Sequence, residues 1–207
     1  HQHKFIEKIL KQFNFDEVHP KSTPVPTNFV VDESSTHLNE EEATIYRSMV
    51  GALMYVVIST RPDMYYAIHL LTRVMSAPTE QMMKLCKRSY RYLKGTKHFI
   101  LKQQRDLSDK CLGFSDTDFA NQNYKRRCLN GYCFYIYGLC VSARSKLQTL
   151  VSLSTCEAEY IGLAFAAREA IFLIYLLQAL GINVQPFPIL GDNECALRLT
   201  EDPVAHD

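Results

Sequence analysis

The sequence lacks the patterns that mark several classes of protein. Its seven cysteines form no CxxC pair and no histidine pair has ligand spacing, which argues against a zinc site. An odd number of cysteines, dispersed over 207 residues, also argues against a disulfide framework and fits a reducing intracellular compartment. The longest apolar run, Met49–Ile58, is about half the length that spans a bilayer, and no signal peptide precedes it. We therefore expect no membrane partner. Because the chain opens with His1 and not Met, we also expect a segment of a longer protein.

The chain has almost no net charge, but its charges are unevenly distributed. Lys and Arg number 23 against 22 Asp and Glu, which gives +1. The stretch Lys84–Arg105 holds eight basic residues and no acidic one, whereas residues 16–42 hold seven acidic residues and only Lys21. A basic segment of this kind is suited to contact phosphates. Hydrophobic residues make up 47% of the chain, which excludes wholesale disorder.

Hydrophobic periodicity divides the chain into a helical first part and a second part that contains strands. The predicted helices of the first part cover residues 4–13, 42–59, 62–75 and 80–94. A long extended connection, residues 14–40, separates the first helix from the second. The predicted strands and helices of the second part are strands 99–103, 111–118, 131–137, 139–143 and 147–153, helix 155–180, strand 187–190 and helix 194–199. We place the boundary between residues 97 and 98. The second part is expected to be a mixed sheet with flanking helices, of the α+β or α/β class.

Two aspartates stand at the ends of predicted strands. Alternation puts Leu112, Phe114, Asp116 and Asp118 on one strand face, whose apolar members we expect in the core, with Asp116 where that face leaves the sheet. Asp192 follows a short strand and precedes a helix. Taken singly, each has an ordinary explanation: Asp116 as a solvated turn carboxylate, and Asp192 as a helix N-cap.

The segment Ser154–Tyr160 contains two glutamates that require separate interpretations. Ser154 and Glu157 match the S-x-x-E capping box, in which the Glu side chain reaches back to the N-cap backbone N–H, so Glu157 receives a structural role. Glu159 has no such explanation, and we place it in the first turn, where the helix dipole favours negative charge. A strand-end Asp, a first-turn Glu and a post-strand Asp, in that order, form the layout of a two-metal site.

The motifs around these carboxylates resemble the ribonuclease H domain of Copia-type long-terminal-repeat retrotransposon Pol polyproteins. The matching segments are Gly113–Ala120, Gly131–Phe134, Ser152–Tyr160, Asp192-Asn193 and Asp202–His206. The first part, residues 1–97, resembles the thumb or connection region that follows the polymerase active site in the same polyproteins. Its matching segments are Tyr46–Tyr55, Thr60–Asp63 and Arg91–Thr96. The matches run across nearly the whole chain in the family's order.

The resemblance implies that residues 98–207 form a ribonuclease H-like domain that hydrolyses RNA in RNA–DNA hybrids with two Mg²⁺ or Mn²⁺ ions. Asp116 would bridge both ions, while Glu159 and Asp192 would hold the ion on the leaving-group side. The family's fourth carboxylate, an Asp in a Lys-His-Ile-Asp segment, is not matched by Asp207. We therefore expect the fold and the site to be incomplete at the C-terminus.

The sequence departs from the family pattern at several points. Phe119 and Phe172 stand where the family usually has Trp, of which this chain has none, and Arg127–Asn130 replaces a Lys-Ser-Thr-Ser segment. The paired-Asp motif of the polymerase is also absent, so no DNA synthesis is expected. These departures keep open a second interpretation, a non-catalytic nucleic-acid-binding or scaffold remnant of a retroelement polyprotein. A third interpretation is a helical interaction module unrelated to nucleic acid. It explains the first part of the chain but gives no reason for the order of the acidic residues.

A cationic helix face is the predicted contact with nucleic acid. Its members recur at i+3 and i+4 spacing: Lys84, Lys87, Arg88, Arg91 and Lys94. A charge run is usually a solvated face, but the lack of acidic neighbours and the resemblance favour phosphate contact. Further candidates beside the acidic site are Lys125, Arg126 and Arg127. The implied partners are an RNA–DNA hybrid and the rest of the polyprotein, including the reverse transcriptase palm and the integrase. The implied location is the cytoplasm, in virus-like particles, or the nucleus.

Overall fold

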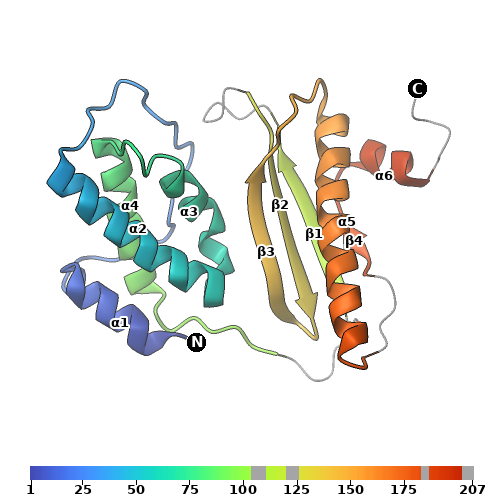
Figure 1. Ribbon diagram of the computed structural model, residues 1–207, viewed down its shortest axis with the longest axis horizontal. Coiled ribbons are helices and arrows are strands. Elements are labelled where there is room, and N and C mark those ends of the chain that lie inside the picture. The colour runs from blue at the N-terminus through green and yellow to red at the C-terminus, as the bar shows by residue number, and fades with distance from the viewer. Residues whose placement is uncertain (104–110, 120–125, 183–186, 202–207) are drawn as a thin grey trace. The chain divides into compact units, whose positions relative to one another are not determined.

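The computed structural model describes residues 1–103, 111–119, 126–182 and 187–201. The chain divides into two compact units, His1–Leu101 and Lys102–Asp207 (Figure 1). The first unit is helical and the second is built around a sheet. Each unit has its own buried core, so each is described by itself.

The helical unit contains four α-helices and one short 3₁₀ turn within its described residues. In order they are α1 (His3–Gln12), α2 (Glu40–Thr60), η1 (Pro62–Met64), α3 (Tyr65–Thr72) and α4 (Glu80–Gly95). Asn39 starts α2 with a capping box, because its side chain accepts from the Glu42 N–H while the Glu42 carboxylate accepts from the Asn39 N–H. The core is formed by fully buried side chains such as Ile6, Tyr46, Leu53, Leu71 and Leu93.

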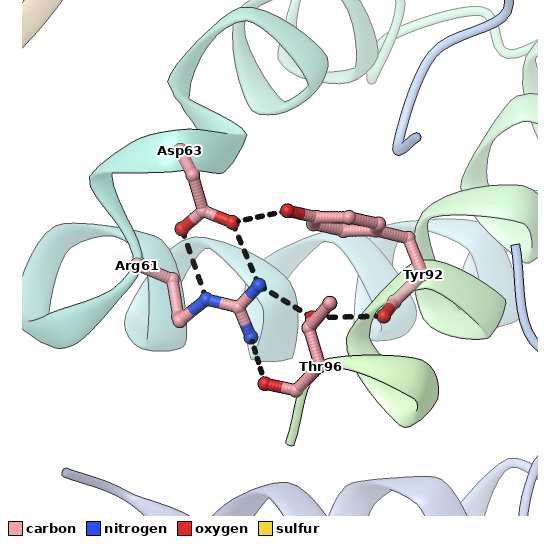
Figure 2. A network of polar contacts seen from close by, with 4 residues as sticks. All are labelled: Arg61, Asp63, Tyr92 and Thr96. Atoms are coloured by element: carbon pink, nitrogen blue, oxygen red, sulfur yellow. Dashed lines mark hydrogen bonds and ion pairs between the residues drawn. The ribbon is translucent and has the colours of Figure 1, made fainter. Parts of the chain in front are cut away.

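Two motifs of this unit, Thr60–Asp63 and Arg91–Thr96, meet in one polar network (Figure 2). Arg61, only 1% exposed, donates to both carboxylate oxygens of Asp63 at 2.9 and 2.7 Å, and to the Thr96 carbonyl and hydroxyl. The Tyr92 hydroxyl donates to Asp63 at 2.7 Å. Burial alone would raise the pKa of Asp63, but the hydrogen bonds from Arg61 and Tyr92 hold that pKa below its usual value. These motifs therefore serve the packing of the helical unit.

The second unit is a mixed sheet with two described helices. Its elements are β1 (Cys111–Asp118), β2 (Leu129–Ile136), β3 (Leu139–Leu147), α5 (Thr155–Ala179), β4 (Ile189–Leu190) and α6 (Glu194–Glu201). The strand order is β3-β2-β1-β4, with β1 antiparallel to β2 and parallel to β4. Tyr137 and Gly138, both at positive φ, make the two-residue turn between β2 and β3. This arrangement is mixed α/β, as expected, and is compatible with a ribonuclease H-like fold.

Helix α5 covers one face of the sheet and closes the core of the second unit (Figure 1). Buried aromatic rings of the strands meet small and apolar residues of the helix. The cluster consists of Cys111, Tyr132, Phe134, Ala166, Ala170, Leu173, Leu177 and Phe187. Gly113 is required because a Cβ there would collide with the Phe134 ring. The long helix is thus held against β1 and β2 by one face, while apolar residues on its other side, such as Phe172 and Tyr175, stay exposed.

Three expectations about the strands are wrong. Residues 99–103 form no strand, and β3 continues to Leu147, so the separate strand expected over 147–153 does not exist. The buried face of β1 consists of Cys111, Gly113, Ser115 and Thr117, whereas Phe114 on the opposite face is 39% exposed. The physical reason is that α5 packs most closely on small side chains, so apolar character alone did not identify the covered face.

Helices α2 and α5 are each long and apolar enough to cross a membrane, judged only by length and composition. Each contributes buried side chains to the core of its own unit, although only 39% of the apolar stretch in α2 and 33% of that in α5 is buried. The absence of a membrane partner stays a prediction.

Candidate metal centre

Three carboxylates converge at one end of the sheet. Asp116 belongs to β1, Glu159 to α5 and Asp192 to the segment between β4 and α6. One oxygen from each lies within 4.8 Å of the others, and in the part of the chain that the structure describes no other His, Cys, Asp or Glu group converges in this way. Asp116 and Asp192 are exposed, whereas Glu159 is only 9% exposed. The structure thus brings together all three predicted metal ligands.

The parallel register of β1 and β4 explains how the two aspartates meet. Phe114 pairs with Leu190, and Asp116 and Asp192 each stand two residues further along their chains. Because parallel strands run in the same direction, both carboxylates emerge at the same end of the sheet. Neither strand sequence reveals this register by itself.

Glu159 reaches the same place from the helix that covers β1. Its Oε1 accepts a hydrogen bond from the Thr117 backbone N–H at 3.2 Å. Since α5 begins at Thr155, Glu159 is its fifth residue and opens the second turn, so the expected first-turn position is wrong by one residue. Contact with β1, and not the helix dipole alone, therefore fixes this carboxylate.

The surroundings of Glu159 favour its protonated form. Burial raises its pKa, and the nearby Asp116 and Asp192 carboxylates raise the pKa further, while hydrogen bonds from Thr117 oppose the shift. A partly desolvated carboxylate beside two other carboxylates is under electrostatic strain. A bound divalent cation would relieve that strain by neutralising the repulsion.

The helix caps separate structural carboxylates from the cluster. Asn193, and not Asp192, caps α6, because its side chain accepts from the Ala196 N–H at 3.0 Å. The N-cap explanation of Asp192 is therefore wrong.

Glu157 shows a variant of the expected capping box. Ser154 accepts from the Glu157 N–H at 3.1 Å as predicted, but the Glu157 carboxylate accepts from the Leu153 N–H at 2.7 Å and not from that of Ser154. Glu157 is exposed and lies outside the three-carboxylate cluster. Its role is to hold the start of α5.

The donor set fits a hard divalent cation. All three groups offer carboxylate oxygens, which Mg²⁺ and Mn²⁺ prefer, and none offers sulfur or imidazole. An octahedral Mg²⁺ with bonds of about 2.1 Å holds its oxygens roughly 3–4 Å apart, so the cluster needs to contract by only about 1 Å. Asp207 and the segment 202–206 lie outside the described residues, as would any ligand they supply.

The cationic face of α4 has partners that the sequence did not reveal. Arg88 donates to the Thr23 carbonyl and hydroxyl, Arg91 to the His19 carbonyl and Lys94 to the Val18 carbonyl. These three side chains therefore hold the extended segment 18–24 along α4. Gly95 permits this approach, since a Cβ there would meet the Pro20 ring at 2.8 Å.

The remaining predicted cations are more open. Lys84 and Lys87 on α4 are exposed, as are Arg126 and Arg127 before β2, while Lys125 lies outside the described residues. Phosphate contact by these five residues stays a prediction. Lys84 and Lys87 are the members of the helix best placed to make it.

The second unit is therefore a mixed α/β fold that carries a three-carboxylate cluster suited to a divalent metal. Sequence comparison shows its relatives. The chain is 34% identical, over 99% of its length, to the retrovirus-related Pol polyprotein from transposon TNT 1-94 of Nicotiana tabacum, and 35% identical, also over 99%, to that from transposon RE1 of Arabidopsis thaliana. It spans only 16% and 14% of those two polyproteins.

A shorter relative also matches. The secreted RxLR effector protein 161 of Plasmopara viticola is 41% identical over 62% of this chain, which covers 90% of that protein. No family model and no solved structure matches the chain. Nearly the whole chain is therefore homologous to a segment of the retrovirus-related Pol polyproteins of plant transposons.

Proposed function

We propose that the second unit is a ribonuclease H that hydrolyses the RNA strand of RNA–DNA hybrids, within the Pol polyprotein of a Copia-type retrotransposon. In that proposal the first unit is the post-palm region of the reverse transcriptase. The observation that carries the proposal is the convergence of Asp116, Glu159 and Asp192 at one end of a sheet with the strand order β3-β2-β1-β4. The homology to Pol polyproteins supports it, because a retrotransposon must remove RNA that is paired with newly made DNA.

The resemblance assigns each carboxylate a role in the proposed reaction. Two Mg²⁺ or Mn²⁺ ions, when bound, activate a water molecule and stabilise the leaving 3′ oxygen. Asp116 on β1 would be a ligand of both ions, and Glu159 and Asp192 would hold the ion on the leaving-group side. Thr117 holds Glu159 by its N–H, and because the pKa of Glu159 is raised, a bound metal ion competes with a proton for this carboxylate.

Recognition of the hybrid is assigned to cations outside the acidic cluster. Arg126 and Arg127 lie beside β2 of the same unit, and Lys84 and Lys87 line the open part of α4. These side chains would contact backbone phosphates, while the 2′-OH and the shape of the hybrid would distinguish RNA from DNA. The proposed partners also include the polymerase palm and integrase of the polyprotein, in cytoplasmic virus-like particles or in the nucleus.

The proposal is tested by cleavage of a labelled RNA–DNA hybrid with Mg²⁺ or Mn²⁺. We predict that Asp192→Asn reduces cleavage by about a hundredfold or more, because it removes one anionic ligand while keeping the side-chain volume. Hybrid binding by the same variant should stay within about twofold, measured by fluorescence anisotropy with Ca²⁺ in place of Mg²⁺.

Matched substrates complete this test. All-DNA and all-RNA duplexes of the same sequence should resist cleavage. Retained cleavage in Asp192→Asn would remove Asp192 from the metal centre. Binding without cleavage, by a chain extended beyond Asp207 to include the family's fourth carboxylate, would instead favour the alternative, a nucleic-acid-binding remnant.

A further inference from the structure

A buried polar network lies between the sheet and the start of α5, directly behind the carboxylate cluster. Its members are Thr117, Asn130, Gln148 and Ser152, each 6% exposed or less. They come from β1, β2 and the segment that follows β3. Polar side chains at such depth cost stability unless they are hydrogen-bonded, so their partners reveal what they do.

The Ala158 carbonyl determines how the Gln148 amide is oriented. A carbonyl only accepts, so the amide atom that faces it at 2.9 Å is the Gln148 Nε2 donor. The same nitrogen also donates to the Asn130 Oδ1, and the Gln148 Oε1 accepts from the Ser152 hydroxyl at 2.8 Å. Both hydrogens and the oxygen of this amide are therefore engaged, and the reversed orientation would set two oxygens against each other.

The network continues from Gln148 to Glu159. The Asn130 Oδ1 faces the Thr117 hydroxyl at 3.2 Å, and these two residues are direct partners in the β1–β2 ladder. The Thr117 N–H then donates to the Glu159 carboxylate. Gln148 thus holds Glu159 in two ways, through the strand residues and through the backbone of Ala158, the residue before it.

The close approach of α5 makes this arrangement sensitive to small shifts. Gly162 faces the network one turn after Ala158, and a Cβ at Gly162 would collide with the Thr117 hydroxyl. The helix therefore sits at the minimum distance from β1 where the carboxylates meet. A hydrogen-bonded spacer at this level sets both the height and the rotation of the helix start.

We propose that Gln148 is a positioning residue for Glu159, holding the start of α5 on β1 and β2 so that the carboxylate stays within reach of Asp116 and Asp192. This role rests on the metal centre proposed above. Gln148 does not contact a metal or substrate. It acts through Ala158, Asn130 and Thr117.

The experiment compares two tethers between the sheet and α5. Gln148→Met keeps the length of the side chain and removes its hydrogen bonds. The matched control is Ser142→Ala, which removes the bond that Ser142 donates to Glu169 at 2.7 Å, about 15 Å further along the same helix than Glu159. Mn²⁺ alone is titrated into the full chain by calorimetry. We expect an affinity about tenfold weaker in Gln148→Met and within about twofold of wild type in Ser142→Ala.

A second readout needs no metal. The amide resonance of Thr117 reports the bond to Glu159 directly, and it should shift in Gln148→Met but not in Ser142→Ala. Unchanged Mn²⁺ affinity and an unchanged Thr117 resonance in Gln148→Met would overturn the positioning role alone. Failure of the wild-type chain to bind Mn²⁺ would overturn the metal centre and this role with it. If Gln148→Met does not fold, Ser152→Ala removes only the donor to Gln148 and should weaken Mn²⁺ binding by about threefold.

Discussion

Glu157 and Glu159 stand two residues apart on one helix and have opposite surroundings. The exposed Glu157 accepts from the backbone before α5, and the buried Glu159 faces two other carboxylates. The sequence predicted this division because only Glu157 has capping spacing relative to Ser154. It did not predict that Glu159 would be held by Thr117, since that contact depends on which face of β1 the helix covers.

The raised pKa of Glu159 leads to a prediction about stability. A carboxyl whose pKa is higher in the folded state than in the unfolded state binds protons more tightly when folded. Stability is therefore lost as pH rises from the unfolded pKa through the folded pKa of Glu159. We predict that Glu159→Gln raises the free energy of unfolding at pH 7 by about 0.5–2 kcal/mol without metal, measured by urea denaturation.

The pH dependence provides the check on that prediction. The gain should shrink as pH falls through the folded pKa, because Glu159 then becomes neutral like Gln. Added Mn²⁺ should stabilise the wild type and not the variant. A Glu159→Gln variant that is less stable than wild type at pH 7 would show that Glu159 is not strained.

Helix α4 uses most of its cationic face within its own unit. Its cations recur on a single face, as the sequence indicated, but three of them hold the extended segment 18–24 by backbone carbonyls. Charge spacing predicts such a face without saying what lies on it. Only the fold shows that Lys84 and Lys87 are the open members.

We predict that Lys84→Glu combined with Lys87→Glu weakens hybrid binding and flattens its salt dependence. Each lost phosphate contact lowers the slope of log K against log salt by about 0.9, so two contacts lower it by about 2. The matched control is Lys4→Glu with Lys8→Glu, which makes the same charge change at exposed positions of α1. Equal salt slopes for the two double variants would remove α4 from the nucleic-acid surface.

The strands were predicted less well than the helices. Helices α1 and α4 have a strong apolar period, and α5 is a long apolar stretch with a recognisable cap at Ser154, so their existence and approximate ends follow from the sequence. Strand β1 instead buries Gly113, Ser115 and Thr117 and exposes Phe114. Its small residues are selected by the close approach of α5, a contact between distant segments that a local pattern does not record.

At the scale of the whole chain, there are two units with separate cores, and all three carboxylates of the candidate site lie in the second. The order of carboxylates along the chain identified the candidate site, but the β1–β4 register brings Asp116 and Asp192 together. That register joins residues 76 positions apart, such as Phe114 and Leu190, so it could not be deduced from either segment. The network behind the site went unpredicted for the same reason, because Gln148 and Asn130 have no distinguishing local spacing.

Hybrid cleavage by Glu159→Gln and Glu157→Gln, measured side by side with Mn²⁺, tests the metal centre most directly. The two changes are chemically identical and lie on the same helix, but only Glu159 belongs to the cluster. We predict a loss of about a hundredfold or more in cleavage rate for Glu159→Gln, and a change within about threefold for Glu157→Gln. Equal losses in the two variants would contradict the assignment of Glu159 as the metal ligand.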